Sequence, residues 1–109
     1  MKPQSAKQKG RKLQQWVVDK LVKILKAHPE DLESRPMGSN GEDIIMARAA
    51  RQLFPYSIEC KNQERVNIWN SYEQAKSNCG KYEPLLIIKK NNTKPLAVVD
   101  AEYFIKSHK

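Results

Sequence analysis

Asp43, Glu59 and Lys61 are the residues whose types and spacing suit a chemical reaction. Residues two apart on a β-strand point the same way, so Glu59 and Lys61 share a face if residues 56–61 form a strand. Asp43 begins the preceding strand and lies beside Glu59 if the two strands pair. Two such carboxylates make a hard oxygen site for Mg²⁺ or Mn²⁺, and the lysine can orient or activate water. This pattern predicts metal-assisted phosphodiester hydrolysis, although a salt bridge on a solvated strand face explains it equally well.

The charge distribution favours a polyanionic partner such as DNA. The chain has 109 residues and a net charge of +8. Residues 1–27 carry a net charge of +7, residues 28–88 carry −2, and residues 89–109 carry +3. Basic ends suit DNA, whereas an acidic middle does not unless its carboxylates have another task. Well-solvated lysine-rich helices are the simpler explanation of the same distribution.

Composition bounds the class of protein. With 39% apolar and 29% charged residues, the chain is expected to form one globular domain over 1–109, with residues 1–8 as a flexible basic tail. No apolar run approaches a membrane span, and the N-terminus lacks the pattern of a secretory signal. Cys60 and Cys79 are too few for a disulfide scaffold, which predicts an intracellular, cytoplasmic protein.

Hydrophobic periodicity predicts an α/β (α+β) fold, a central mixed sheet flanked by helices in the order αβββαββα. Helices are expected over 8–27, 67–78 and 101–107, with one or two helical turns at 47–53. Strands are expected near 35–37 and over 43–46, 56–61, 85–88 and 96–99. The apolar stripe of the first helix comprises Leu13, Trp16, Val17, Leu21, Ile24 and Leu25. Trp16 and Trp69 are interpreted as core or dimer anchors rather than base-stacking platforms.

These motifs resemble the PD-(D/E)xK nuclease superfamily, and within it the small Holliday-junction resolvases of archaea and similar phage-encoded nucleases. The resemblance spans about residues 9–106. It rests on Lys9-Gly10-Arg11, Ser39, Gly41-Glu42-Asp43-Ile44-Ile45, Ile58-Glu59-Cys60-Lys61-Asn62, Tyr72-Glu73-Gln74 and Leu86-Ile87-Ile88-Lys89.

The resemblance implies a restriction-endonuclease-like core and a Mg²⁺-dependent endonuclease, a hydrolase that acts as a homodimer on four-way DNA junctions in DNA recombination. Asp43 and Glu59 would be the metal ligands, Lys61 the catalytic lysine, and Gln74 a helix glutamine near the site. Ser39 matches a turn serine near the scissile phosphate, although it is equally a plain turn former. The basic residues of the first helix are the best candidates to contact the DNA backbone: Lys9, Arg11 and Lys12.

Two positions depart from the family pattern. Gln14 stands where archaeal resolvases have a helix glutamate, which leaves a second metal ion open. Glu42 replaces a proline found in many members, and it either adds charge to the site or serves as a turn residue. Two alternatives to junction cleavage follow: a nuclease for duplex or single-stranded DNA, or a DNA-binding module with a degenerate site. The expected dimer surface comprises Trp69, Tyr103, Phe104 and residues 85–88.

Overall fold

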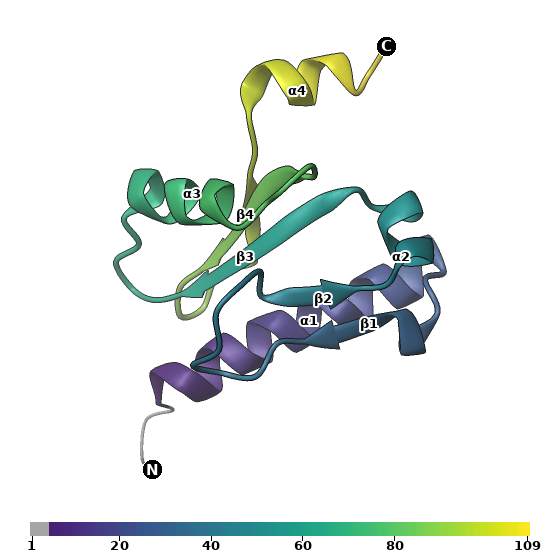
Figure 1. Ribbon diagram of the computed structural model, residues 1–109. Helices are drawn as coiled ribbons and strands as arrows, with labels where there is room; N and C mark the ends of the chain where they lie inside the picture. Colours follow the sequence, from purple (N-terminus) through teal and green to yellow (C-terminus); the bar gives the residue numbers. More distant parts are fainter. Residues whose placement is uncertain (1–4) are drawn as a thin grey trace.

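The strands form two sheets in the computed structural model, which describes residues 5–109 (Figure 1). β1 (Leu32–Ser34) and β2 (Ile44–Met46) pair antiparallel as a two-stranded sheet. In the other sheet β3 (Tyr56–Asn62) runs parallel to β4 (Glu83–Lys89), which pairs antiparallel with β5 (Leu96–Val98). The fold is therefore mixed α/β in the predicted order, but the expected single central sheet is divided in two.

A backbone hydrogen bond joins the two sheets where β2 begins. The Asp43 N–H donates to the Ile58 carbonyl at 2.9 Å, and beyond this point β2 turns away from β3 (Figure 1). Because β2 then pairs with β1, its buried residues Ile44 and Met46 join the core beneath α1 instead of extending the larger sheet.

The helices are α1 (Ala6–Leu25), α2 (Arg48–Leu53), α3 (Ile68–Ser77) and α4 (Ala101–Lys106), with a short 3₁₀ turn at Pro29–Asp31. A capping box between Ser5 and Gln8 starts α1 by satisfying two backbone N–H groups. Residues 6–8, expected in a flexible tail, therefore belong to the helix. Residues 1–4 of that expected tail lie outside the described residues.

Helices α1 and α3 pack against opposite faces of the larger sheet. Ile58 and Cys60 of β3 join the core formed with α1, together with Leu85 and Ile87 of β4. The alternate residues of these strands face α3, whose buried Ala75 covers this side. β3 is consequently buried on both faces. The sequence also allowed Glu59 to lie on a solvent-exposed face of the strand, but Ser57 and Glu59 are only 1% and 5% exposed.

Several apolar residues lie elsewhere than predicted. Trp16 and Ile24 are 41% and 65% exposed. The buried stripe of α1 runs through Leu13, Val17 and Leu21, and Trp16 and Ile24 lie outside it. Trp69 is 82% exposed and is likewise no part of the monomer core. The segment 85–88 was expected at a dimer surface, but Leu85, Leu86 and Ile87 are buried between the two helices.

The first strand is also displaced from its predicted position near residues 35–37. The paired segment is Leu32–Ser34, with Leu32 buried. Arg35 N still donates to the Asp43 carbonyl at 2.8 Å, and the chain then enters a turn in which Ser39 N donates to the Pro36 carbonyl at 3.3 Å.

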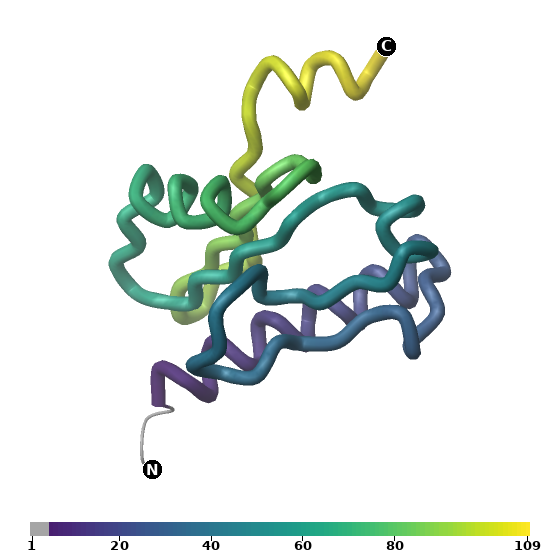
Figure 2. Tube along the Cα trace, in the orientation of Figure 1, coloured from purple at the N-terminus to yellow at the C-terminus, as the bar shows by residue number. Residues whose placement is uncertain are grey.

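Helix α4 extends away from the rest of the chain (Figures 1 and 2). Asp100 caps its first turn, and Tyr103 packs edge-on against Tyr56 with ring centroids 5.7 Å apart. Phe104 and Ile105 remain 54% and 70% exposed. No helix within residues 5–109 combines the length and the apolar character that crossing a membrane requires.

Candidate active site

Five predicted site residues gather around one open hollow of about 260 Å³, which we call the site hollow. It lies beside β3, near the point where β2 and β3 diverge, and α1 contributes three residues to its lining while α3 contributes one. The structure thus brings together Gln14, Asp43, Glu59, Lys61 and Gln74. Its lining also includes residues for which the sequence predicted no role at the site: Ala6, Gly10, Met37 and Gln63.

Asp43 is fixed by the edge of β3 through both its backbone and its side chain. Its N–H donates to the Ile58 carbonyl at 2.9 Å, and its Oδ2 accepts the Cys60 N–H at 2.7 Å. The Asp43 side chain therefore takes the place of a further strand residue in pairing with β3. This arrangement sets the carboxylate beside the hollow without requiring β2 to continue along the sheet.

Glu59 and Lys61 lie on one face of β3, as the alternation predicts. Glu59 is almost fully buried, whereas the Lys61 side chain retains 23% exposure and reaches the hollow. Lys61 Nζ lies 3.7 Å from Glu59 Oε1, close enough for an ion pair but longer than a direct hydrogen bond. The Lys61 ammonium is therefore close to the Glu59 carboxylate but remains able to contact a ligand in the hollow.

Burial disfavours the ionised form of both carboxyl groups, and the charge of Asp43 disfavours ionisation of Glu59. Burial, together with the nearby Asp43 charge, raises the pKa of Glu59 from 4.5 to about 7, against the opposing effect of Lys61. Burial also raises the pKa of Asp43, although the Cys60 N–H, Lys61, Arg35 and Gln14 all act to lower it. A cation in the hollow would counter this repulsion directly, because it favours the ionised form of both groups.

Gln14 lies buried on α1 and lines the site hollow. Its Oε1 accepts a hydrogen bond from Ser34 Oγ, and its neutral amide acts to lower the pKa of the Asp43 carboxyl. Because the amide oxygen is engaged by Ser34, the amide nitrogen is the group that remains available as a donor toward the hollow.

The donor set suits a single hard cation held in part by water. Among residues 5–109 no three His, Cys, Asp or Glu side chains form a metal-binding group, so the protein would supply Asp43, Glu59 and a backbone oxygen. The Cys60 carbonyl can be that oxygen, because a strand residue directs its N–H and carbonyl to the same side and the Cys60 N–H points to Asp43. Mg²⁺ usually retains several waters and binds one or two carboxylates, which fits these residues.

Glu42 does not line the site hollow. Its carboxylate pairs with Arg51 of α2 and accepts a hydrogen bond from Ser57 Oγ at 2.8 Å. Arg51 in turn lies over the Tyr82 ring and donates to the Tyr56 carbonyl. Of the two roles considered for Glu42, extra charge at the site and a turn residue, the structure supports neither fully. It is a partly buried link between α2 and β3 that no local pattern indicated.

The expected DNA-contacting residues divide into two groups. Lys9 and Lys12 line a basic hollow next to the site, and the Lys9 carbonyl accepts a hydrogen bond from Asn62 Nδ2 at 3.0 Å. Arg11 is exposed on α1 and lines neither hollow. Ser39 is exposed and donates to the Pro36 carbonyl, which is the geometry of a plain turn former.

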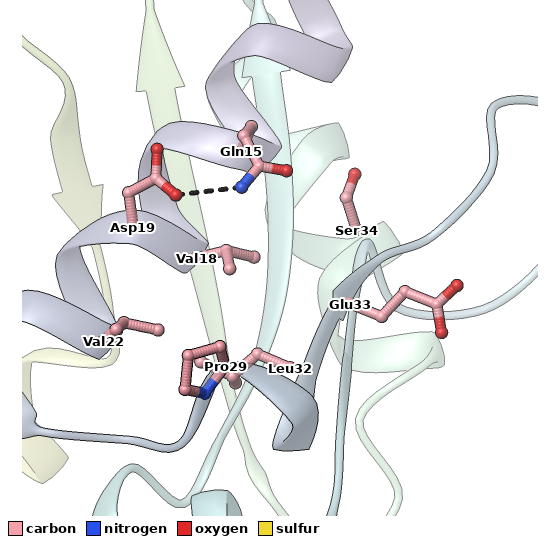
Figure 3. Close-up of a pocket in the computed structure, with 8 residues that line it drawn as sticks. All are labelled: Gln15, Val18, Asp19, Val22, Pro29, Leu32, Glu33 and Ser34. Atoms are coloured by element: carbon pink, nitrogen blue, oxygen red, sulfur yellow. Dashed lines mark hydrogen bonds between the residues drawn. The ribbon is translucent and has the colours of Figure 1, made fainter.

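A separate hollow of about 490 Å³ lies between α1 and β1 (Figure 3). Its charged residues are Asp19, which accepts a hydrogen bond from Gln15 at 2.9 Å, and Glu33 on β1. Two carboxylates and no basic group make this hollow unsuited to a phosphate chain.

The Glu59 carboxyl predicts an unusual pH dependence of stability in metal-free protein. Because its folded-state pKa is raised to about 7, the folded state binds a proton that the unfolded state has lost between about pH 4.5 and 7. Stability should therefore fall as pH rises through this window. In EDTA, Glu59→Gln should raise the melting temperature at about pH 8 and change it little at about pH 5. Exposed Glu64→Gln is the matched control; equal pH profiles for wild type and Glu59→Gln would contradict the assignment.

Comparison with known proteins adds no relative to this picture. No protein-family model matches the chain, and neither the curated proteins nor the solved structures contain a match.

Proposed function

We propose that this protein is a metal-dependent DNA endonuclease that hydrolyses phosphodiester bonds in four-way or other branched DNA. The observation that carries the proposal is the convergence of Asp43, Glu59, Lys61 and Gln74 on one hollow. Paired carboxylates beside a lysine, in a chain of net charge +8, suit a phosphate substrate and a divalent cation. The family resemblance and its restriction-endonuclease-like core belong to the same proposal, supported by the order of elements around β3.

The reaction adds water across a phosphodiester bond. The water oxygen bonds to phosphorus, the bond from phosphorus to the leaving sugar oxygen breaks, and that oxygen receives a proton. A Mg²⁺ or Mn²⁺ ion held by Asp43, Glu59 and the Cys60 carbonyl would polarise the phosphate and offset charge on the leaving oxygen. Lys61 orients the attacking water and stabilises the charge that develops on phosphate oxygens. Gln74, on the α3 side of the hollow, offers an amide to the water or the phosphate.

Gln14 favours a mechanism with one metal ion. Its amide oxygen accepts a hydrogen bond from Ser34, and a neutral amide is a weaker metal ligand than a carboxylate. The presence of this amide where a carboxylate was expected also favours the alternative function, a DNA-binding module with a degenerate site. Intact Asp43, Glu59 and Lys61 in one hollow speak for catalysis. A further alternative is cleavage of ordinary duplex or single-stranded DNA. A comparison of cleavage rates on branched, duplex and single-stranded DNA distinguishes it from cleavage of branched DNA.

Lys61→Ala should abolish cleavage while it leaves DNA binding nearly intact. Loss of a group that stabilises transition-state charge typically lowers the rate by about 10² to 10³, whereas binding depends on many phosphate contacts. The assay compares four-way, Y-shaped, duplex and single-stranded DNA with and without Mg²⁺, and exposed Lys76→Ala is the control. Metal-dependent cutting of the branched substrates is expected. Wild-type cutting by Lys61→Ala would refute the catalytic assignment, and no cutting of any DNA by wild type would favour the binding module.

A homodimer is part of the proposal, because two symmetric nicks in a junction need two sites related by a two-fold axis. The exposed apolar residues of α4, Phe104 and Ile105, support such a contact. Light scattering at micromolar concentration should give twice the 12.6 kDa chain mass, and Ile105→Lys should give the monomer. Ile24→Lys, at a similarly exposed isoleucine of α1, is the matched control. A wild-type monomer both with and without junction DNA would refute the dimer.

A further inference from the structure

Three hollows meet at the end of β3, where Asn62 and Lys89 are paired residues of adjacent strands. Asn62 lines both the site hollow and the basic hollow beside α1. Gln63 lines both the site hollow and a hollow of about 220 Å³ against the turn between β4 and β5. Lys89 lines the basic hollow beside α1 and the hollow against the turn between β4 and β5. The site hollow therefore has a neighbouring hollow on either side, and each of these shares a lining residue with it.

The hollow beside α1, which we call the Trp16 hollow, combines an aromatic ring with cations. It has a volume of about 260 Å³ and is lined by Trp16 together with Lys9, Lys12 and Lys89. Residues 9, 13 and 16 follow the helical spacing i, i+4, i+7, so α1 presents them as one stripe along the hollow. Lys20 adds a further cation, with Nζ 5.5 Å from the centre of the Trp16 ring.

The Trp16 ring is not buried in the core, and among residues 5–109 the lysines around it are not paired with carboxylates. Trp16 is 41% exposed although it is a large apolar side chain. Within the described part of the chain, Lys9, Lys12 and Lys89 form no ion pair with a carboxylate. An exposed aromatic ring among unpaired cations is the combination by which proteins hold single-stranded nucleic acid, with bases stacked on rings and phosphates beside lysines.

We propose that the Trp16 hollow is a subsite for single-stranded DNA, in which an unpaired base stacks on Trp16 and the flanking phosphates contact Lys9, Lys12 and Lys89. The placement of this subsite beside the cut rests on the proposed nuclease function. A base within a duplex is stacked between its neighbours and cannot reach the ring without unstacking. The substrate class is therefore DNA with an unpaired nucleotide next to the scissile phosphate, as at a branch point or a flap, rather than continuous duplex.

The two tryptophans of the chain allow a direct test, because Trp69 lies on α3 and lines none of the three hollows. In EDTA, an oligo(dT) strand should quench the fluorescence of Trp69→Phe, in which Trp16 is the one tryptophan. It should leave the fluorescence of Trp16→Phe unchanged. Trp16→Ala should weaken oligo(dT) binding about tenfold, within the range for loss of one stacked base, whereas Trp69→Ala should bind within a factor of about two.

Lys12→Ala and Lys23→Ala form a second matched pair on α1, since both lysines are exposed and Lys23 lies outside the hollow. The first should weaken oligo(dT) binding and flatten its salt dependence, and the second should not. Unquenched Trp16 fluorescence, or wild-type affinity in Trp16→Ala, would overturn the subsite even if the protein cuts DNA. Quenching in a protein that cuts no DNA with Mg²⁺ would uphold the subsite and refute the nuclease.

Discussion

The hydrogen bonding of Asp43 to the edge of β3 is the interaction on which this structure depends. Its N–H reaches the Ile58 carbonyl and its Oδ2 accepts from the Cys60 N–H, so this residue joins the β1–β2 hairpin to β3 through both its backbone and its side chain. The same contacts orient its carboxylate toward the site hollow, which Gln14 of α1 also lines. Stability and site geometry are therefore coupled: a change that frees Asp43 loosens the hairpin and displaces the candidate metal ligand together.

The charges of the site destabilise the protein when no ligand is bound and favour the binding of a cation. Burial raises the pKa values of both Asp43 and Glu59, and the charge of Asp43 raises that of Glu59 further, so the metal-free site resists having both groups ionised. A divalent cation between them would relieve this repulsion and attract a phosphate that the two carboxylates alone would repel. The lysines of the adjoining Trp16 hollow attract the rest of the nucleotide chain. The acidic middle and basic ends of the sequence thus become parts of one proposed surface.

Local patterns predicted what depends on local geometry. Alternation along β3 placed Glu59 and Lys61 on one face, and the strand expected over residues 85–88 lies within β4. The sequence did not reveal contacts between distant segments, such as Gln14 with Ser34 or Glu42 with Arg51 and Ser57. Trp16 fits the helical period as well as its buried neighbours do; only the position of the sheet beneath α1 decides that it is exposed.

Binding of Mn²⁺, followed by its electron paramagnetic resonance signal and by calorimetry, tests most directly whether the hollow is a metal site. Asp43→Asn keeps an oxygen that can accept the Cys60 N–H but loses the charge, and exposed Asp19→Asn is the matched control on α1. We expect the wild type and Asp19→Asn to bind one ion per chain, and Asp43→Asn to lose most of that affinity while it remains folded. Equal Mn²⁺ binding by wild type and Asp43→Asn would contradict the account.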